Sequence, residues 1–341
     1  MVQSAINLGV VGLGGWGKFV VRNFSQTAGC KLKYICDASS ESLSRQGRLY
    51  PDAIPTNQYS DLLDDLELDA VALATPAPMH YDMARAALLA DKHVYVEKPM
   101  ALSAEHAESL VELAETRGLK LMVGHLLLYH PAVEMMKQQV DAGELGEIYY
   151  MYCQRLNLGV VRQNENSFWS LAPHDISVIL HLFDSEPIRV EASGQSYLQQ
   201  GVEDVVMATL HFPGGRMANI HVSWLDPHKT RSMTLVGSEK MLVFDDMQPT
   251  EKIRIFDKAA TVSLVPERPQ TPVNVRHGDI LAPRISPREP LAVETSHFIE
   301  SIVNDTQPRS DGYDGLRVVR VLEAVENQLR QIERPFLRRA A

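Results

Sequence analysis

The sequence is poor in cysteine and lacks long apolar runs, and both deficits exclude whole classes of protein. It has 3 cysteines in 341 residues, Cys30, Cys36 and Cys153, whose spacing fits neither a metal site nor a redox pair. We therefore expect free thiols in a reducing, cytoplasmic compartment. No apolar stretch reaches the ~18 residues of a membrane-spanning helix, and we identify no signal-peptide pattern.

Positive charge is also in short supply. The chain carries 33 Lys and Arg against 43 Asp and Glu, a net charge of −10, which argues against a nucleic-acid partner. We expect no membrane partner either, because no apolar run is long enough to span a bilayer. An anionic small substrate stays possible, because a few local arginines outweigh a diffuse negative field. The length indicates two domains, and 45% hydrophobic with 22% charged residues is ordinary for a globular protein.

The most informative stretch is an apolar run over residues 6–11 that ends in a G-x-G-x-x-G pattern. Gly12 suits the tight turn from strand to helix, Gly14 lets a pyrophosphate approach the backbone, and Gly17 lets helix and strand pack closely. The pyrophosphate would lie at the positive N-terminal end of the helix. The predicted cofactor contacts in this loop are Gly12, Gly14, Gly15, Trp16 and Gly17.

An aspartate follows at the position expected for the residue that holds the adenosine ribose. Asp37 ends a second apolar segment and lies 20 residues after Gly17. A carboxylate there accepts hydrogen bonds from ribose hydroxyls and repels a 2′-phosphate. The next arginine is Arg45, so the sequence favours NAD over NADP.

The first 125 residues alternate strand-like and helix-like segments, which indicates an α/β fold with a doubly wound parallel sheet. We predict an NAD-binding Rossmann domain over residues 1–125. Ligands of such sheets bind at the carboxyl ends of the strands. The residues that fall at or just after predicted strand ends are Gly12, Asp37, Ala74, Thr75, Pro76, Glu97, Lys98 and His125.

Residues 126–341 change character and predict an α+β substrate-binding domain with a large, mostly antiparallel open sheet. Strand-like segments dominate, with a helix over residues 173–183, a long loop over 261–290 and two closing helices. Helices or another subunit would have to cover the open sheet face. We therefore expect a homo-oligomer, a dimer or a tetramer.

The order of motifs along the chain resembles the glucose–fructose oxidoreductase, inositol dehydrogenase and MocA (Gfo/Idh/MocA) family. The motifs are the glycine pattern, Asp37, Ala74-Thr75-Pro76 with His80, Glu97-Lys98-Pro99, Gly124-His125 and a helical His174. The resemblance covers essentially the whole chain. It implies hydride transfer between NAD(P) and a sugar or polyol hydroxyl, with His80, Glu97 and His125 in the cofactor site.

Lys98 is the predicted catalytic base. Oxidation of a secondary alcohol requires loss of the hydroxyl proton as hydride leaves the carbon. A partly desolvated lysine beside cationic nicotinamide should have a lowered pKa and act near neutral pH. The alternative, a surface lysine after a strand, is the usual interpretation of a lone lysine, but the E-K-P context opposes it here.

His174 matches the family's active-site histidine, with a role in proton relay or hydroxyl binding. Pro173 before it suits the first turn of a helix. Many family members carry an aspartate four residues before this histidine, where this chain has Ser170. Asp175 projects about 100° away on a helix. Lys98 and His174 are thus left as the predicted catalytic pair.

The substrate prediction rests on residues 155–177. Arg155 and Arg162 suit an anionic substrate, because guanidinium pairs bidentately with phosphate or carboxylate. Asn157 lies between them. Trp169 would stack on nicotinamide or sugar, or would pack in the core. The stretch is similar to family members that oxidise C3 of UDP-activated N-acetylamino sugars.

The sequence therefore predicts an NAD-dependent dehydrogenase that oxidises C3 of UDP-N-acetylglucosamine or its uronate, with no metal ion. Three alternatives stay open. They are a dehydrogenase of a free polyol such as inositol, an NAD-dependent glycosidase of the same fold, and a non-catalytic NAD-binding sensor.

Overall fold

The computed structural model describes residues 5–262 and 273–331, and the chain forms two compact units. The first unit combines Met1–Tyr129 with Arg288–Arg320, and the second combines His130–Pro287 with Val321–Ala341. The sequence-based division placed every residue after 125 in the second domain, whereas Arg288–Arg320 folds with the first unit.

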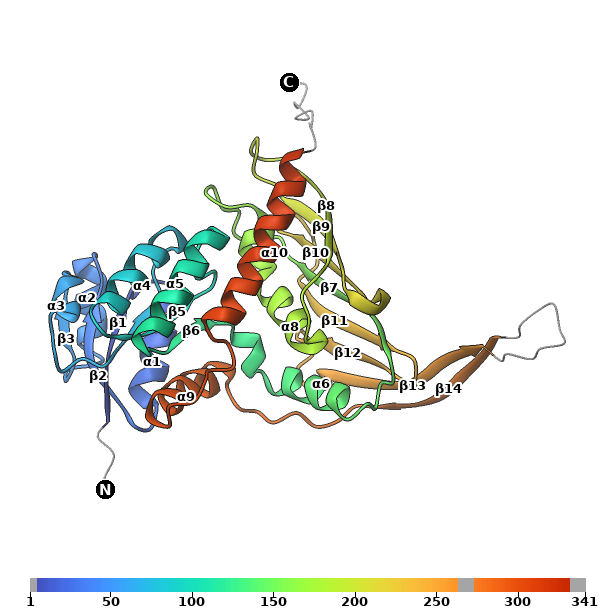
Figure 1. Ribbon diagram of the computed structural model, residues 1–341, viewed down its shortest axis with the longest axis horizontal. Coiled ribbons are helices and arrows are strands. Elements are labelled where there is room, and N and C mark those ends of the chain that lie inside the picture. The colour runs from blue at the N-terminus through green and yellow to red at the C-terminus, as the bar shows by residue number, and fades with distance from the viewer. Residues whose placement is uncertain (1–4, 263–272, 332–341) are drawn as a thin grey trace. The chain divides into compact units, whose positions relative to one another are not determined.

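The first unit contains a six-stranded sheet in the order β3-β2-β1-β4-β5-β6, in which every neighbouring pair is parallel (Figure 1). Helices connect the strands, which confirms the doubly wound α/β prediction. The strands are β1 (Ile6–Val11), β2 (Cys30–Cys36), β3 (Ile54–Thr56), β4 (Ala70–Leu73), β5 (His93–Glu97) and β6 (Leu121–Gly124). The helices are α1 (Gly17–Gln26), α2 (Ser40–Gly47), α3 (Ser60–Leu63), η1 (Ala77–Met79), α4 (His80–Leu89), α5 (Ala104–Arg117), η2 (Leu126–Tyr129) and α9 (Pro290–Val303).

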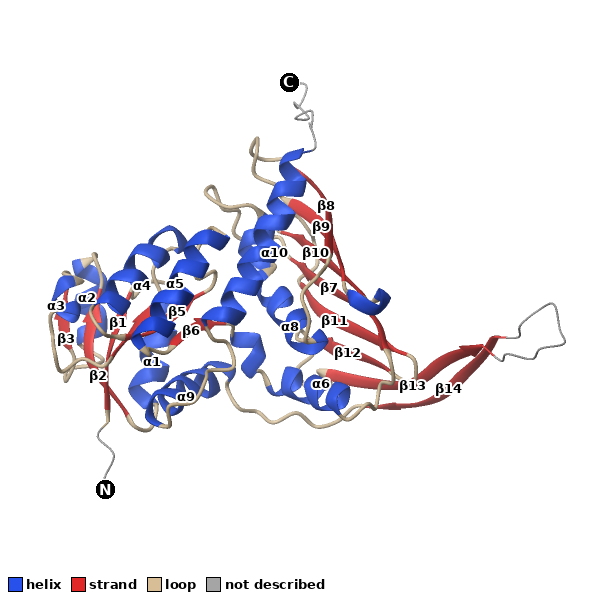
Figure 2. Ribbon diagram, viewed as in Figure 1, coloured by secondary structure: helices blue, strands red, loops and turns tan. Residues whose placement is uncertain are grey.

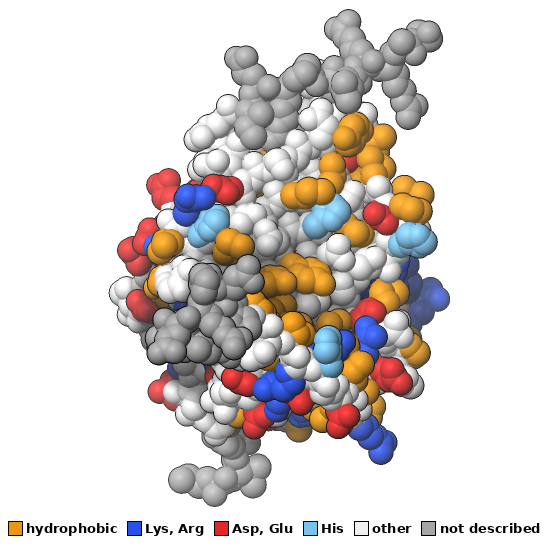
Figure 3. All heavy atoms as spheres, turned by 90° about the vertical axis from the view of Figure 1, so that its right-hand side faces the viewer, with side chains coloured by type: hydrophobic (Ala, Val, Ile, Leu, Met, Phe, Trp, Pro, Cys, Tyr) orange, Lys and Arg blue, Asp and Glu red, His pale blue; other side chains and the backbone are white. Residues whose placement is uncertain are grey.

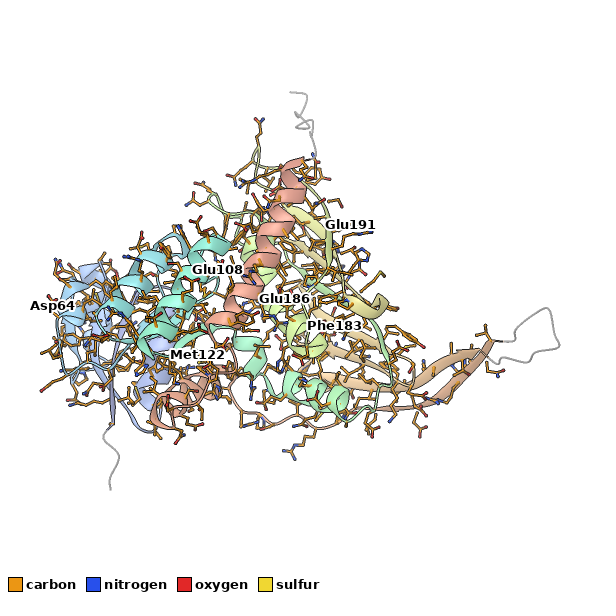
Figure 4. The ribbon with its side chains drawn as sticks, viewed as in Figure 1. Asp64, Glu108, Met122, Phe183, Glu186 and Glu191 are labelled. Atoms are coloured by element: carbon orange, nitrogen blue, oxygen red, sulfur yellow. The ribbon has the colours of Figure 1, made fainter. Side chains whose placement is uncertain are left out.

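Burial on both faces explains why the central strands are continuous apolar runs. All four residues of β4 are buried, and so are all four of β6, including Met122 (Figure 4). From β1 the chain adds β2 and β3 on one side and then returns to add β4 on the other side of β1. The strand order therefore reverses between β1 and β4. The loops after these two strands therefore flank the crevice where such sheets bind ligands.

Helix α9 joins the first unit because its apolar face packs on that unit's aromatic core. Phe298 lies edge-on to Phe24 of α1 and to Tyr95 of β5, with ring centroids 6.1 and 5.9 Å apart. All three rings are fully buried. Local sequence patterns do not predict this contact, because its residues are far apart in the chain.

The second unit is built on an eight-stranded sheet in the order β14-β13-β12-β11-β7-β10-β9-β8. Only β7 and β10 pair in parallel, so the predicted mostly antiparallel sheet is confirmed. The strands are β7 (Ile148–Leu156), β8 (Arg189–Gln195), β9 (Val205–His211), β10 (Met217–Ser223), β11 (Thr230–Gly237), β12 (Met241–Asp245), β13 (Ile253–Val262) and β14 (Val273–Leu281). The helices are α6 (Pro131–Asp141), α7 (Ser167–Leu171), α8 (Pro173–Phe183), η3 (Pro213–Gly215) and the C-terminal part of α10 (Gly312–Gln331).

Helices cover one face of this sheet and leave the other open (Figure 2). Along β7, Met151 and Cys153 are buried, whereas Tyr150 and Tyr152 are 39% and 38% exposed. Met217 of β10 lies opposite Tyr150 in the register and extends the open face. Figure 3, which looks onto the right-hand side of Figure 1, shows hydrophobic side chains and histidines dispersed over the surface there.

Strand β14 lies where the sequence predicted a long loop, and the end of β13 enters the same range, so that prediction is wrong for Val273–Leu281 and for residues 261–262. This strand pairs antiparallel with β13, and each of its residues is exposed. With neither face buried, its apolar residues show no inside–outside alternation that would mark a strand. The part of the predicted loop over residues 263–272 lies outside the described residues.

Two smaller predictions can be compared directly with the fold. Cys30, Cys36 and Cys153 are free thiols, and burial raises the pKa of Cys36 to about 11. Among the helices of residues 5–262 and 273–331, none combines the length and apolar character that a bilayer crossing requires.

Candidate active site

The loop after β1 has the backbone geometry of a pyrophosphate-binding turn. Gly12 has a φ of +88°, and a Cβ there would lie 2.6 Å from the carbonyl oxygen of Ala74. A Cβ on Gly17 would lie 1.8 Å from the carbonyl oxygen of Gly12, so neither position tolerates a side chain. A Cβ on Gly14 or Gly15 would meet nothing within 4 Å, which leaves the N-terminal end of α1 open to a phosphate.

Asp37 is fixed at the end of β2 by two backbone donors. The N–H of Leu13 donates to Oδ2 at 2.6 Å, and the N–H of Ser39 donates to Oδ1 at 2.8 Å. The carboxylate thereby ties the glycine loop to the neighbouring strand end. Each oxygen keeps a lone pair for a further donor such as a ribose hydroxyl.

His80 is a buried connection between the ends of β4 and β5. Its Nε2 lies 2.8 Å from the carbonyl oxygen of Thr75, and its Nδ1 lies 2.8 Å from that of Pro99. Burial lowers its pKa. The ring thus orients the turn that carries Lys98, in which the Lys98–Pro99 peptide bond is cis. Both ring nitrogens of His80 thus contact backbone carbonyls of the first unit.

Glu97 at the end of β5 joins two more parts of the first unit. Its Oε1 accepts hydrogen bonds from the indole Nε1 of Trp16, at 2.5 Å, and from the hydroxyl of Tyr95, at 3.1 Å. Burial raises the pKa of Glu97, while these donors and the charge of Lys98 oppose that rise. Trp16 is thereby held at the start of α1, beside the glycine loop.

His125, directly after β6, has an uncharged and unsatisfied imidazole. Burial, together with the charge of Lys98, lowers its pKa to about 3. Neither ring nitrogen finds a hydrogen-bond partner among the described residues, and the same holds for the buried Oγ1 of Thr75. Buried polar atoms without partners are rare, so these two side chains fit a polar ligand such as the nicotinamide end of a dinucleotide.

In the second unit, Arg155 of β7 forms a buried ion pair with Asp175 of α8. Its Nε and Nη2 donate to the two carboxylate oxygens at 2.9 and 3.0 Å. The two side chains are 12% and 2% exposed. Asp175 therefore neutralises the arginine that we predicted as a substrate contact. The pair also fixes the first turn of α8, where His174 is the second residue.

The other predicted substrate residues lie around the same part of the second unit. Arg162 is exposed and pairs with Glu165 at 2.9 Å. Asn157 follows β7, and its backbone N–H donates to the carbonyl of Ser223. Trp169 is 9% exposed, and its Nε1 donates to Glu326 at 3.2 Å. Of the two interpretations offered for Trp169, packing in the core agrees with this geometry.

A cationic residue that the sequence analysis missed, Arg231, lies opposite Arg155 in the β7–β11 register. Its side chain is 43% exposed, and its Nη1 is 3.9 Å from Asp246, which Lys252 contacts at 2.8 Å. The available signal was the alternation of β11, in which Arg231 precedes the buried Met233 and Leu235 on the same face.

The structure thus gathers the predicted residues into two sets, one in each unit. The glycine loop, Asp37, Thr75, the E-K-P turn and His125 belong to the first unit, and Arg155, Arg162, Trp169 and His174 belong to the second. The first set has the strand-end placement, the open glycine turn and the unsatisfied polar atoms that a dinucleotide requires.

Fold, motifs and family comparison define the class of protein. Residues 6–125 match the description "Oxidoreductase family, NAD-binding Rossmann fold", and residues 133–243 match "GFO/IDH/MocA C-terminal domain". The chain belongs to the Gfo/Idh/MocA family of oxidoreductases, as its motifs predicted.

Within the family, relatives act on different substrates. The chain is 28% identical to UDP-N-acetylglucosamine 3-dehydrogenase from Acidithiobacillus ferrooxidans, over 97% of this chain and 98% of that enzyme. A solved structure of that enzyme superposes with a TM-score of 0.81 at 25% identity, covering 96% of this chain and 98% of the other. The scyllo-inositol 2-dehydrogenase (NAD(+)) of Bacillus subtilis is 24% identical, over 96% of this chain and 95% of that enzyme.

Proposed function

We propose that this oxidoreductase uses NAD to oxidise the C3 hydroxyl of a nucleotide-linked N-acetylamino sugar, UDP-N-acetylglucosamine or its uronate, to the 3-keto sugar. The observation that carries the substrate class is the end-to-end similarity to the Acidithiobacillus enzyme. The reaction class follows from the family and from the E-K-P turn beside the uncharged His125.

Lys98 is the residue that takes the substrate proton in this proposal. A bound nicotinamide ring supplies the acceptor for the hydride that leaves C3. The Nζ of Lys98 receives the proton of the C3 hydroxyl, and His174 of the second unit binds or relays protons for the substrate hydroxyls. His80 and Glu97 hold the turn around Lys98, and the neutral ring of His125 donates or accepts one hydrogen bond without adding charge.

NAD, and not NADP, is the proposed cofactor. The supporting observation is Asp37, whose carboxylate is fixed at the end of β2 by the backbone of Leu13 and Ser39. A negative charge fixed there favours ribose hydroxyls and repels a 2′-phosphate.

A free polyol is the second candidate substrate, because Asp175 neutralises Arg155 and an inositol dehydrogenase is also a full-length relative. The NAD-dependent glycosidase of the same fold stays a third candidate, and release of an aglycone without net cofactor reduction would identify it.

We also propose that the protein is a homo-oligomer that uses the open sheet face. Tyr150, Tyr152, Met207 and Met217 expose 37–53% of their surface there. An exposed apolar sheet face of this kind is typical of protein interfaces. Light scattering coupled to gel filtration would give the mass, and a monomer at micromolar concentration would contradict this proposal.

Replacement of Lys98 tests the proposed chemistry. Lys98→Met removes the proton acceptor and keeps the length and apolar part of the side chain. We expect hydride transfer to fall at least 100-fold, while NAD still binds, as measured by fluorescence titration. Unchanged turnover in Lys98→Met would show that Lys98 is not the base.

A further inference from the structure

The helix-covered face of the eight-stranded sheet is apolar along its length and charged at one end. On three neighbouring strands, β7, β11 and β12, the side chains on the helix-covered face are buried and apolar except at one end of the sheet. We call the positions on this face inward positions. The buried pairs are Met151 and Cys153, Met233 and Leu235, and Leu242 and Phe244. Two residues further toward the same end, the inward positions are Arg155 on β7, Arg231 on β11 and Asp246, which directly follows β12.

Two arginines therefore lie directly opposite each other in the β7–β11 ladder, an arrangement that is destabilising without compensation. The compensation is unequal. Arg155 donates two hydrogen bonds to the carboxylate of Asp175, at 2.9 and 3.0 Å. This pair is nearly sealed from solvent and uses both carboxylate oxygens.

Arg231 has no comparable partner. Its closest carboxylate oxygen, Oδ2 of Asp246, is 3.9 Å away, beyond hydrogen-bond distance. Asp246 is held instead by Lys252, whose Nζ donates to its Oδ1 at 2.8 Å and to its carbonyl at 2.9 Å. No group in the described part of the chain accepts a hydrogen bond from the Arg231 guanidinium.

The charges around Arg231 come from several elements. Arg155, Arg231 and Lys252 contribute three positive charges and Asp175 and Asp246 two negative charges, while Glu134 of α6 acts on His130. The Nε2 of His130 lies 3.8 Å from Oδ1 of Asp246, but the ring adds no positive charge. Its Nδ1 accepts the N–H of Ala132, and burial lowers its pKa, so the ring is neutral.

The cluster adjoins a residue of the candidate site, since Asp175 directly follows His174 in the first turn of α8. Arg231 is also reachable, because 43% of its side chain is exposed whereas Arg155 is 12% exposed. A planar guanidinium with unused donors binds an oxyanion through two parallel hydrogen bonds.

We infer that Arg231 binds the anionic part of the substrate, a phosphate or carboxylate group, in the role that the sequence predicted for Arg155. This inference rests on the proposed function, which supplies an anionic substrate. Arg155 is then a positioning residue, which fixes Asp175 and with it the start of α8.

The test compares Arg231→Gln, Arg231→Lys and a matched control, Arg189→Gln on β8. Arg189 is also an exposed strand arginine, with its own partner in Glu191. Arg231→Gln removes a like charge opposite Arg155, so we expect it to fold and to bind NAD normally. Binding of UDP by calorimetry, and KM and kcat with UDP-N-acetylglucosamine, its uronate and scyllo-inositol, are measured for each variant.

We expect Arg231→Gln to weaken UDP binding or raise KM by about 10- to 100-fold with kcat little changed. Arg231→Lys should be intermediate and Arg189→Gln unchanged. An effect with both nucleotide sugars identifies phosphate as the bound group, and an effect with the uronate alone identifies the carboxylate.

Two results would overturn the inference, and they differ in what they say about the proposed function. If the wild type oxidises a nucleotide sugar and Arg231→Gln behaves like Arg189→Gln, Arg231 has no such role while the proposed function stands. If the wild type acts only on scyllo-inositol and does not bind UDP, both fail. Arg231-dependent UDP binding without turnover supports the inference and contradicts the proposed reaction.

Discussion

The hydroxyl of Tyr95 lies 3.1 Å from Oε2 of Glu294, deep inside the first unit. The same hydroxyl lies 3.1 Å from Oε1 of Glu97. It carries one proton, so it donates to one carboxyl group and accepts from the other, which must be protonated. Burial, and then the charge of Glu97, raise the pKa of Glu294 well above its usual range. We therefore predict that Glu294 is the protonated carboxyl group of the two.

Substitution of Glu294 tests this assignment. Glu294→Gln keeps a neutral donor of the same shape, so its free energy of unfolding should stay within about 1 kcal/mol of the wild type. Glu294→Ala leaves a cavity and removes the donor to Tyr95, and should cost about 2–4 kcal/mol. Urea denaturation at pH 7 measures both, with the exposed Glu108→Ala as control (Figure 4). Equal losses for Gln and Ala would mean that Glu294 is ionised.

Asp314 should make stability depend on pH. Burial raises its pKa to about 7, helped by the charge of Asp311 and opposed by that of Arg317. The unfolded value is about 4. Between these values the folded chain keeps a proton that the unfolded chain has lost. The free energy of unfolding therefore falls as pH rises, by at most about 1.4 kcal/mol per pH unit.

Asp314→Asn should remove that slope. The variant is expected to match the wild type near pH 4, where both side chains are neutral, and to be more stable at pH 8. Thermal unfolding across this range measures the difference, and Asp64→Asn, at an exposed position directly after α3, is the control (Figure 4). Parallel curves for the wild type and Asp314→Asn would contradict a protonated Asp314.

Removing one partner of the Arg155–Asp175 pair should lower the free energy of unfolding much more than replacing both. Arg155→Leu or Asp175→Leu leaves one buried charge without its partner, and each should lower the free energy of unfolding by about 3–5 kcal/mol. The double variant should lose much less than the sum. A urea double-mutant cycle measures the coupling, and additive losses would show that the two charges do not depend on each other.

Asp37 should set the cofactor preference. In Asp37→Ala the charge that repels a 2′-phosphate is lost, together with the acceptor for the Leu13 and Ser39 amides. We expect the ratio of kcat/KM for NAD to that for NADP to fall at least tenfold, while the exposed Asp52→Ala keeps the wild-type ratio. An unchanged ratio in Asp37→Ala would mean that another group discriminates between the cofactors.

Local sequence patterns predicted most of the fold because the patterns and the structure share their physical cause. Continuous apolar runs such as Ala70–Leu73 mark strands that are buried on both faces. Gly118 ends α5 in the left-handed conformation, as expected of a glycine after a helix. β14 escaped prediction because it has no buried face.

The site was harder to predict where a role depends on a distant partner. Arg155 and Asp175 are 20 residues apart, and nothing local shows that one neutralises the other. Trp169 meets Glu326 across 157 residues, and α9 returns to the first unit through Phe298. The positions of the glycine turn and the E-K-P turn at strand ends were predictable because each depends on its own short stretch of sequence.

A single-turnover absorbance measurement tests the central claim most directly. Protein at a concentration stoichiometric with NAD is mixed with UDP-N-acetylglucosamine, its uronate or scyllo-inositol, and reduced nicotinamide is followed. Stoichiometric protein makes even a tightly held cofactor visible after one reduction. We predict reduction with a nucleotide sugar and none with scyllo-inositol. Reduction with scyllo-inositol alone, or with none of the three, would contradict the proposed function.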